Sequence, residues 1–227
     1  LIFIGFVPLL YVLDINREKY SFKIFLYIYL TFLIWNTIST NWLFYATLEG
    51  MLFAILVNSL LMTIVFSLYK IVSTKINKKL SYIFLISLWI SFEKFHLIWD
   101  FSWPWLNLGN VFSENIEWIQ WYEYTGTFGG TLWVLAVNIL IYKILKNIID
   151  NKKLKKLSIT TFLIIIIPIA ISKYIYNFID IDEKQKNIFI VQPNVDPYKE
   201  KYSKSNTDGY FYLYNLLEFY ITNYCNY

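Results

Sequence analysis

Six apolar runs alternate with short polar or charged segments as far as Tyr176. A helix needs about 20 residues to cross the hydrocarbon core of a bilayer, and about 17–25 are tolerated. The fourth run reaches across only if it tilts little or includes Lys79 and Phe95, and Pro168 is expected to kink or close the sixth. The runs are Leu1–Leu13, Phe22–Ile38, Met51–Tyr69, Leu80–Phe95, Phe128–Tyr142 and Ser158–Tyr176. The pattern predicts a polytopic α-helical membrane bundle over residues 1-179, with about six spans and a truncated first span.

The pattern changes after Asn177. A polar segment, Asp180–Lys186, leads into the apolar stretch Asn187–Val191, which is too short to span a membrane and is typical of a buried strand. Pro193 ends this strand, because proline cannot continue a central strand. Apolar positions then recur at helical spacing over Thr207–Asn223. Because strand, loop and helix in this order open an α/β domain, we expect residues 187-227 to be its truncated N-terminal part.

The basic residues gather in alternate connections between the apolar runs. Two connections, Ser39–Gly50 and His96–Tyr124, carry no Lys or Arg. The other three contain Arg17, Lys19, Lys23, Lys70, Lys75, Lys78, Lys79, Lys143, Lys146, Lys152, Lys153, Lys155 and Lys156. Connections rich in Lys and Arg remain in the cytoplasm. The sequence therefore predicts that these three face the cytoplasm, and that the two cation-free connections and residues 187-227 lie outside.

Composition agrees with a membrane protein, since 57% of the residues are hydrophobic and only 16% are charged, whereas about 25% are charged in a soluble domain. The single cysteine, Cys225, excludes a disulfide within the chain, and one histidine offers no zinc cluster. We therefore expect no metal and no cofactor. The basic connections are explained by topology, and we expect no nucleic-acid partner.

The segment Phe92–Gly130 concentrates the unusual residues. It holds five of the nine tryptophans, the only histidine and four of the seven glycines. Tryptophans here could form an interfacial belt, because the indole ring prefers headgroup depth. The sequence Trp103-Pro104-Trp105 is more specific, since proline restricts its own backbone and that of the preceding residue. A rigidly presented pair of this kind suits a wall or gate for an acyl chain.

Several small and polar residues have two interpretations each. Gly126 and Gly130, four residues apart with Gly129 beside them, favour close helix packing over ligand contact. Glu93 and His96 share a helix face at the outer end of the fourth run. They are either functional or paired inside the membrane, where charge is costly, or simply interfacial. The asparagines within the runs are expected to bridge neighbouring helices; they are Asn36, Asn58 and Asn138.

These motifs together resemble the membrane domain of bacterial apolipoprotein N-acyltransferase, and the resemblance covers nearly the whole chain in order. It is carried by Trp103–Gly109 (WPWLNLG), then Gln120, then Thr125–Gly130 (TGTFGG) and Asn138. Ile190–Asn194 (IVQPN) resembles the first strand of that family's nitrilase-like domain, and Pro8-Leu9 resembles its second span. The family has eight spans, and its nitrilase-like α-β-β-α sandwich lies in the periplasm between the seventh and eighth. The six runs would be the second to the seventh.

The resemblance implies an activity and its partners. The family transfers an acyl chain from a phospholipid donor to the N-terminal diacylglyceryl-cysteine of an apolipoprotein acceptor in the bacterial inner membrane, by a ping-pong reaction. A cysteine thioester carries the acyl chain, a glutamate acts as base and a lysine stabilises the oxyanion. These three residues are expected beyond Tyr227, so neither Glu218 nor Cys225 is assigned a catalytic role and the chain alone is expected to be inactive.

The resemblance also names candidate positions in this chain. Substrate-binding candidates are Trp103, Pro104, Trp105, Gln120, Gln192, Asn194 and Tyr202. Structural motif positions are Gly109, Gly126, Gly129, Gly130 and Asn138. Tyr202 stands near a position where many members carry tryptophan. One alternative is a transporter or structural membrane protein with a small outer domain. Another is a membrane-tethered amidase, against which the tryptophan loop argues because a soluble substrate needs no lipid-facing wall.

Overall fold

A computed structural model describes residues 1–17, 20–178 and 214–215 of the chain. The chain divides into two units, Leu1–Ile179 and Asp180–Tyr227. Of the second unit the structure describes only Tyr214 and Asn215, which are helical, so the expected strand over Asn187–Val191 lies outside the described residues. The described part of the first unit is mainly helical, with no strand in it.

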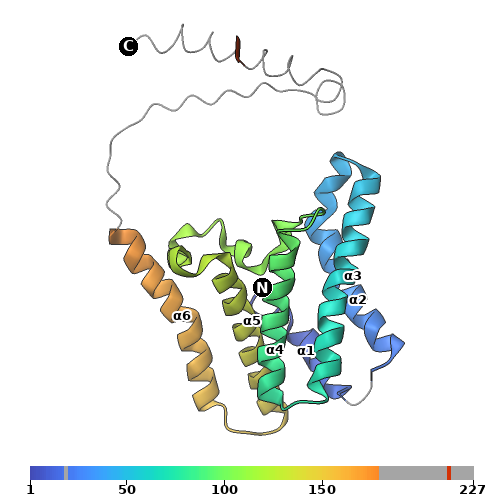
Figure 1. Ribbon diagram of the computed structural model, residues 1–227. Helices are drawn as coiled ribbons and strands as arrows, with labels where there is room; N and C mark the ends of the chain where they lie inside the picture. The colour runs from blue at the N-terminus through green and yellow to red at the C-terminus, as the bar shows by residue number, and fades with distance from the viewer. Residues whose placement is uncertain (18–19, 179–213, 216–227) are drawn as a thin grey trace. The chain divides into compact units, whose positions relative to one another are not determined.

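The first unit is a bundle of six α-helices whose connections alternate between its two ends (Figure 1). The helices are α1 Val7–Ile15, α2 Phe22–Thr40, α3 Leu48–Ser73, α4 Lys78–His96, α5 Tyr122–Ile149 and α6 Lys155–Phe178. Short 3₁₀ helices join α2 to α3 and α4 to α5: η1 Asn41–Tyr45, η2 Pro104–Leu106, η3 Leu108–Phe112 and η4 Ile116–Trp118. The predicted basic connections lie at one end of the bundle, and the two cation-free connections lie at the other.

Each of the six apolar runs forms a helix, but the helices differ in length. Within the described residues four are long and apolar enough to cross a membrane, namely α2 together with η1, and α3, α5 and α6. Helix α1 has nine residues and begins only at Val7, after a series of turns. Helix α4 has 19 residues and includes Lys79 and Phe95, as its length required. That α1 and α4 complete a set of six spans remains a prediction.

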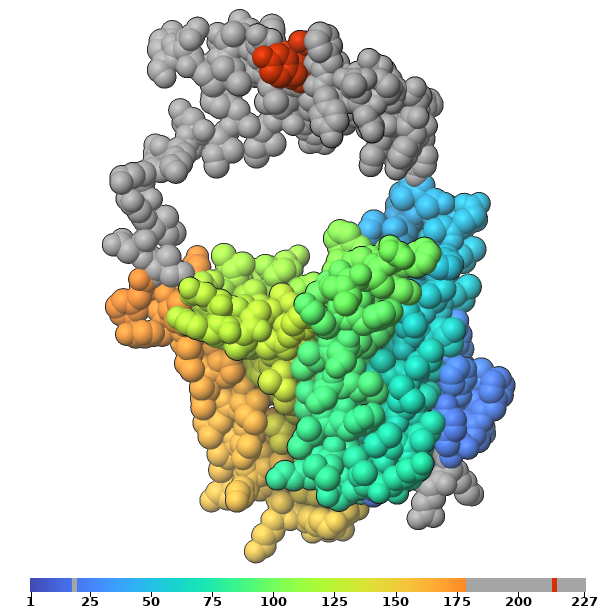
Figure 2. All heavy atoms as spheres, in the orientation of Figure 1, coloured from blue at the N-terminus to red at the C-terminus, as the bar shows by residue number. Residues whose placement is uncertain are grey.

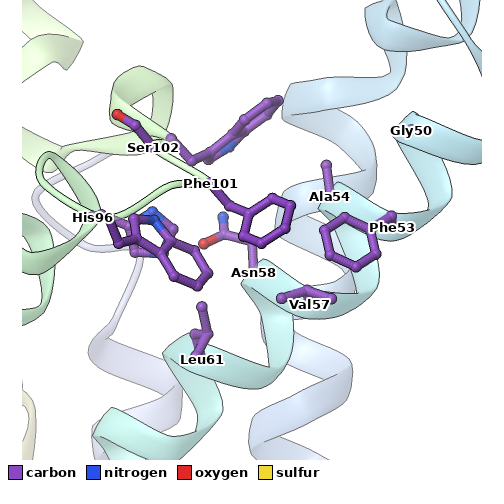
Figure 3. A pocket seen from close by; sticks show the side chains of 11 residues that line it. Gly50, Phe53, Ala54, Val57, Asn58, Leu61, His96, Phe101 and Ser102 are labelled. Carbon is purple, nitrogen blue, oxygen red and sulfur yellow. The ribbon is translucent and has the colours of Figure 1, made fainter.

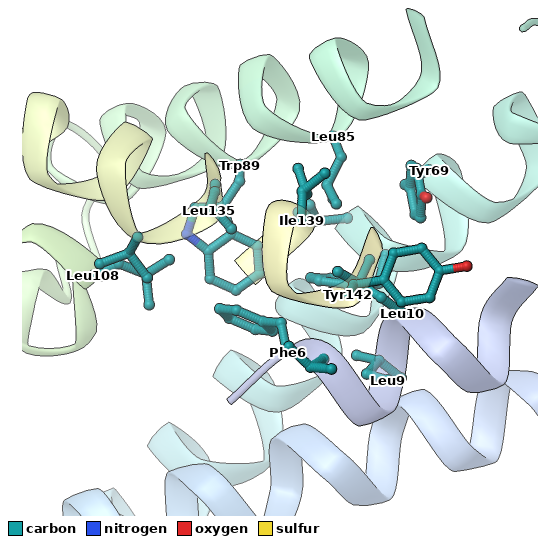
Figure 4. Close-up of a cluster of buried hydrophobic side chains, with 14 of the residues drawn as sticks. Phe6, Leu9, Leu10, Tyr69, Leu85, Trp89, Leu108, Leu135, Ile139 and Tyr142 are labelled. Carbon is teal, nitrogen blue, oxygen red and sulfur yellow. The ribbon is translucent and has the colours of Figure 1, made fainter. Parts of the chain in front are cut away.

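Large aromatic side chains fill the centre of the bundle. Trp89 of α4, Phe32 of α2 and Phe66 of α3 are fully buried, and Phe6 stacks on Phe66 with ring centroids 5.5 Å apart. Figure 4 shows Phe6 and Trp89 facing each other across this cluster. Lipid tails are as apolar as these residues, so close packing rather than water exclusion holds membrane helices together. Interdigitated rings provide many such contacts.

Buried amides fix the helices at two further places. The Asn58 side-chain amide on α3 donates to Asn36 Oδ1 on α2 at 2.6 Å. The Asn138 side chain on α5 accepts from the Phe6 N–H at 2.9 Å and donates to the Ile2 carbonyl at 2.8 Å. These asparagines therefore bridge different segments. Asn138 in particular supplies partners to backbone groups ahead of α1 that no helix satisfies.

A charged cluster closes the basic end of the bundle. Asp14 lies between Lys78 of α4, at 3.0 Å, and Lys146 of α5. Burial raises the pKa of Asp14, but the ammonium groups of Lys146 and Lys78 outweigh it and hold the pKa at about 2. Lys70 of α3 is also buried, and its ammonium group donates to the Leu13 carbonyl at 2.9 Å, near the C-terminus of α1, which compensates the burial of its charge. The cluster ties four helices together.

Candidate functional site: a tryptophan loop over an apolar pocket

The connection from α4 to α5 forms a cap over the cation-free end of the bundle. It passes through η2, η3 and η4 without a long helix, and Pro104 begins the first of them. Proline suits the first position of a helical turn, where its missing N–H is not needed. Figure 2 shows this connection covering the end of the bundle between α3 and α6. We call residues 97–121 the tryptophan loop.

The buried carboxylate of Glu93, at the last turn of α4, is the main anchor of this loop. It is 2% exposed and accepts three hydrogen bonds. Oε1 accepts from Trp89 Nε1 at 2.9 Å and from the Leu108 N–H at 2.8 Å, and Oε2 accepts from the Thr131 hydroxyl at 2.6 Å. The three donors belong to α4, the loop and α5, so one side chain joins three segments. No ion pair to Glu93 occurs in the described part of the chain.

Two glycines let the loop approach α5 at backbone contact distance. A Cβ on Gly109 would lie 1.9 Å from the Thr127 carbonyl oxygen, and one on Gly130 would lie 2.9 Å from Gly109 Cα. The Gly109 N–H donates to Thr131 Oγ1 at 3.1 Å, and the Tyr122 hydroxyl donates to the Gly109 carbonyl at 2.9 Å. The contact needs glycine on both sides because any side chain would separate the two backbones.

Gly126 and Gly130 have different structural roles. Gly130 packs closely, as expected, but nothing lies within 4 Å of a Cβ placed on Gly126. Gly126 instead has φ 64° and ψ −173°, which breaks the first turn of α5 from the rest of the helix. A side chain is strained in this conformation. Helix packing therefore explains Gly130, whereas backbone conformation explains Gly126.

An apolar pocket of about 220 Å³ lies between the first half of α3 and the tryptophan loop (Figure 3). In Figure 3 His96 stands on one side and Phe53 on the other, with Asn58 and Leu61 deeper. No Lys, Arg, Asp or Glu is among the described residues that line it. The lining residues are Gly50, Phe53, Ala54, Val57, Asn58, Leu61, His96, Trp99, Phe101, Ser102 and Trp103. A pocket with these walls accepts an apolar chain, and none of the carboxylate, ammonium or guanidinium groups of the described residues lines it to neutralise a charged ligand.

The two tryptophans flanking Pro104 point to different places. Trp103 lines the apolar pocket. Trp105 is 62% exposed and packs edge-on against Trp42 of η1, with centroids 6.0 Å apart. The Trp103 and Trp99 indole nitrogens and both His96 ring nitrogens are buried without a hydrogen-bond partner in the described part of the chain. Trp103 is therefore a pocket wall and Trp105 an outer surface residue, rather than two halves of one wall.

The remaining candidates lie elsewhere. Gln120 faces α6, where its backbone N–H donates to the Ser172 hydroxyl, and its side chain donates to the Ile116 carbonyl at 2.8 Å. It is not among the residues that line the pocket. Asn138 lies in the bundle core. Gln192, Asn194 and Tyr202 lie outside the described residues.

A second apolar groove, of about 530 Å³, runs between α5 and α6. Trp121 and Gly129 line it at the loop end, and Pro168 lines it on α6. Trp133 crosses to α6 here, and its Nε1 donates to the Ile164 carbonyl at 2.8 Å. Pro168 has no N–H to give to this carbonyl four residues earlier, so the tryptophan supplies the missing donor. Helix α6 continues to Phe178, so Pro168 does not close it.

Two parts of the site are not evident from the sequence. Phe53, Val57 and Leu61 of α3 read only as membrane-span residues, although they form one wall of the pocket. No pattern in the sequence links Thr131 to Glu93, or Tyr122 to Gly109. Glu93 itself was evident in the sequence, where a carboxylate at the end of an apolar run is expected to be either functional or paired, or else interfacial.

The arrangement of helices, loop and pocket indicates the class of protein. Several apolar helices and a cap of aromatic residues over an apolar pocket belong to a multi-pass membrane protein that contacts lipid. Among the described residues there is no group of three His, Cys, Asp or Glu side chains able to hold a metal.

Comparison with known proteins names the family. Residues 1–140 match the apolipoprotein N-acyltransferase N-terminal domain, which is more than half of the chain. The chain therefore belongs to the apolipoprotein N-acyltransferase family. It is similar to an apolipoprotein N-acyltransferase of Chlorobaculum tepidum, with 23% identity over 205 residues that cover 88% of this chain. The chain spans 38% of that relative's length. No solved structure matches it.

Proposed function

We propose that this chain is the lipid-binding membrane part of an enzyme that transfers an acyl chain from a phospholipid to apolipoproteins. The acceptor would be the α-amino group of their N-terminal diacylglyceryl-cysteine, in the bacterial inner membrane. Family membership supports the reaction class. Residues 187-227 would begin the nitrilase-like domain on the periplasmic side, which the charge pattern of the connections supports.

The observation that carries the proposal is the apolar pocket beneath the tryptophan loop. It lies at the cation-free end of the bundle, between α3 and the tryptophan loop, and its walls are mainly aromatic and aliphatic. An acyl chain of a phospholipid in the outer leaflet would reach this depth without leaving an apolar environment. We propose that Trp103 contacts this chain, while Trp105 lies at the level of the headgroups.

The chemical step would take place outside the described residues. A cysteine thiolate would attack the ester carbonyl of the phospholipid, the acyl–oxygen bond would break, and the lysophospholipid would leave. The acceptor's amine would then attack the thioester, forming the amide and returning the thiol, with a glutamate as base and a lysine at the oxyanion. Those residues would follow Tyr227, so this chain alone would form no hydroxylamine-sensitive acyl adduct on Cys225.

The test is acyl transfer by the whole protein, normalised to folded protein. Burying a large aromatic side chain is worth about 1.5–3 kcal/mol, which corresponds to roughly ten- to a hundredfold in affinity. We expect Trp103→Ala to weaken phospholipid use by about this factor, whereas Trp105→Ala has a smaller effect. Tyr124→Ala is the control, because Tyr124 is 76% exposed and lies outside the pocket. Normal turnover per folded molecule in the Trp103 variant would mean that the loop is only an interfacial anchor.

A transporter is not favoured. Transporters place ionisable groups near the middle of the membrane at broken helices. The buried ionisable residues described here lie at helix ends: Lys70 at the basic end, and Glu93 and His96 at the opposite end. The described pocket is lined mainly by apolar residues, which also argues against a tethered amidase acting on a soluble substrate.

A further inference from the structure

Glu93 is buried and forms no ion pair within the part of the chain that the structure describes, and this costs stability. Removing a carboxylate from water is expensive unless hydrogen bonds compensate it. Here the compensation comes from three neutral donors, on Trp89, Leu108 and Thr131, at 2.6–2.9 Å. Buried polar groups are retained in some proteins because they select one arrangement among several. Glu93 accepts from the backbone N–H of Leu108, which begins η3 in the tryptophan loop. The arrangement that Glu93 selects is therefore the conformation of this loop.

We propose that Glu93 is a positioning residue for lipid binding, which acts through the tryptophan loop without touching the lipid. This inference rests on the proposed function, because it assigns to Glu93 the alignment of Trp103 over the apolar pocket. Glu93 is not among the residues lining that pocket. It instead fixes Leu108, which follows η2 and so sets where Trp103 and Pro104 lie.

A second hydrogen-bonded path reaches the same loop through Thr131. Its hydroxyl donates to Glu93 Oε2 and accepts from the Gly109 N–H. The Gly109 carbonyl in turn accepts from Tyr122. Successive loop residues, Leu108 and Gly109, are therefore held from α4 and α5 together. At the centre of this network the Glu93 carboxyl accepts from donors on three different segments.

Glutamine is the informative substitution because it keeps the shape of the side chain. Its oxygen can still accept from Trp89 and Leu108, but its NH₂ group would face the Thr131 hydroxyl and reverse that bond. We expect Glu93→Gln to fold and to raise the apparent KM for phospholipid by roughly three- to thirtyfold, the range for weakening a charge-assisted hydrogen bond. The rate at saturating phospholipid should stay near that of the unmodified protein, since no catalytic group has moved.

Thr131→Val provides the test of coupling. Valine has nearly the shape of threonine but cannot join Glu93 to Gly109. If the two residues act through one network, the effects of Glu93→Gln and Thr131→Val on KM will not add in the double variant. Glu114→Gln is the matched control, because Glu114 is an exposed carboxylate in the same loop. It should leave KM unchanged.

A spectroscopic measurement tests the inference without any turnover. With 5-fluorotryptophan in the whole protein, Glu93→Gln should shift the fluorine resonances of Trp103 and Trp105, assigned by Trp→Phe variants. The Trp89 resonance should shift as well, because the Trp89 indole N–H donates to Glu93. The Trp42 resonance is not diagnostic, because Trp42 packs against Trp105. The control variant Glu114→Gln should leave the resonances of Trp103 and Trp105 in place.

The outcomes separate this inference from the proposed function. Shifted loop resonances with a raised KM support positioning. Loss of activity in proportion to loss of folded protein, with an unchanged KM, would make Glu93 a stability residue and overturn the inference. Unshifted resonances of Trp103 and Trp105 would overturn it too. If the unmodified protein uses no phospholipid, the proposed function fails, whereas the resonances still report whether Glu93 positions the loop.

Discussion

At the scale of single residues, the site depends on positions where one atom more would not fit. Gly109 meets the backbone of α5 at the Thr127 carbonyl, and Gly130 meets Gly109 from the other side. Backbone atoms cannot rotate out of the way as a side chain does. The approach of the loop to α5 is therefore set by the absence of two Cβ atoms, and Glu93 then fixes its direction.

Gly109→Ala should disturb this contact strongly. The new Cβ would lie 1.9 Å from the Thr127 oxygen, and overpacking a well-packed site costs about 1–3 kcal/mol or more. Thermal unfolding in detergent should show a clear fall in the transition temperature. Gly5→Ala is the control, since its nearest atoms lie at 3.8 and 3.9 Å, an ordinary contact distance. Equal transition temperatures for the two variants would show that the loop gives way more easily than its geometry implies.

At the scale of elements, the attachment of α6 depends on few contacts. Only Thr161 and Ser172 of this helix are buried in the described bundle. Trp133 donates to the Ile164 carbonyl that Pro168 leaves without a helical partner, and Ser172 accepts from the Gln120 backbone. Pro168 thus leaves the Ile164 carbonyl of α6 without a helical partner, and Trp133 of α5 donates to it. The interruption of the α6 hydrogen-bond ladder is therefore a point of contact between the two helices.

Trp133→Phe should weaken this joint, because it leaves the Ile164 carbonyl without its donor. We expect a loss of about 1–2 kcal/mol, the range for one buried hydrogen bond within a protein or membrane bundle. Pro168→Ala should reduce that loss, since alanine gives the carbonyl a helical N–H. The measurement is a double-mutant cycle of unfolding free energies in detergent. Strictly additive effects would argue against any link between the proline and the tryptophan.

At the scale of the whole molecule, the first unit has two chemically different ends. The basic end holds Asp14 with its lysine partners, and the opposite end holds the cation-free tryptophan loop. The positive-inside rule orients such a bundle with its basic end in the cytoplasm. This orientation would place the apolar pocket in the outer leaflet, on the side proposed for the nitrilase-like domain.

Cysteine labelling in intact cells tests the orientation. Exposed Thr74 follows α3 in a basic connection, and exposed Ser113 follows η3 in the tryptophan loop, so cysteines introduced there in a Cys225→Ser background report on the two ends of the bundle. A membrane-impermeant reagent should modify the Ser113 position and leave the Thr74 position unmodified until the cells are opened. Cysteine at exposed Lys152 is a second inner position and should behave like Thr74. Labelling of Thr74 from outside would reverse the proposed topology.

The sequence by itself determined the family, the six helices and the position of the connections. Span length and the placement of lysines are read from local composition, because each span must satisfy its own backbone in lipid. The motif around Trp103–Gly109 likewise needs no tertiary contact to be recognised. Glycine spacing was only half informative: it identified Gly130 as a packing residue, but the positive φ of Gly126 was not visible in the pattern.

Tertiary structure alone decided which residues form the site. Glu93 and Thr131 are 38 residues apart and meet because α4 and α5 pack side by side. The pocket combines Phe53 of α3 with Trp103 of the loop, and Trp105 turns away from it although only Pro104 separates the two tryptophans. Such pairings depend on helix rotation and on backbone approach. Both are fixed by close packing among segments distant in sequence, and local patterns do not encode them.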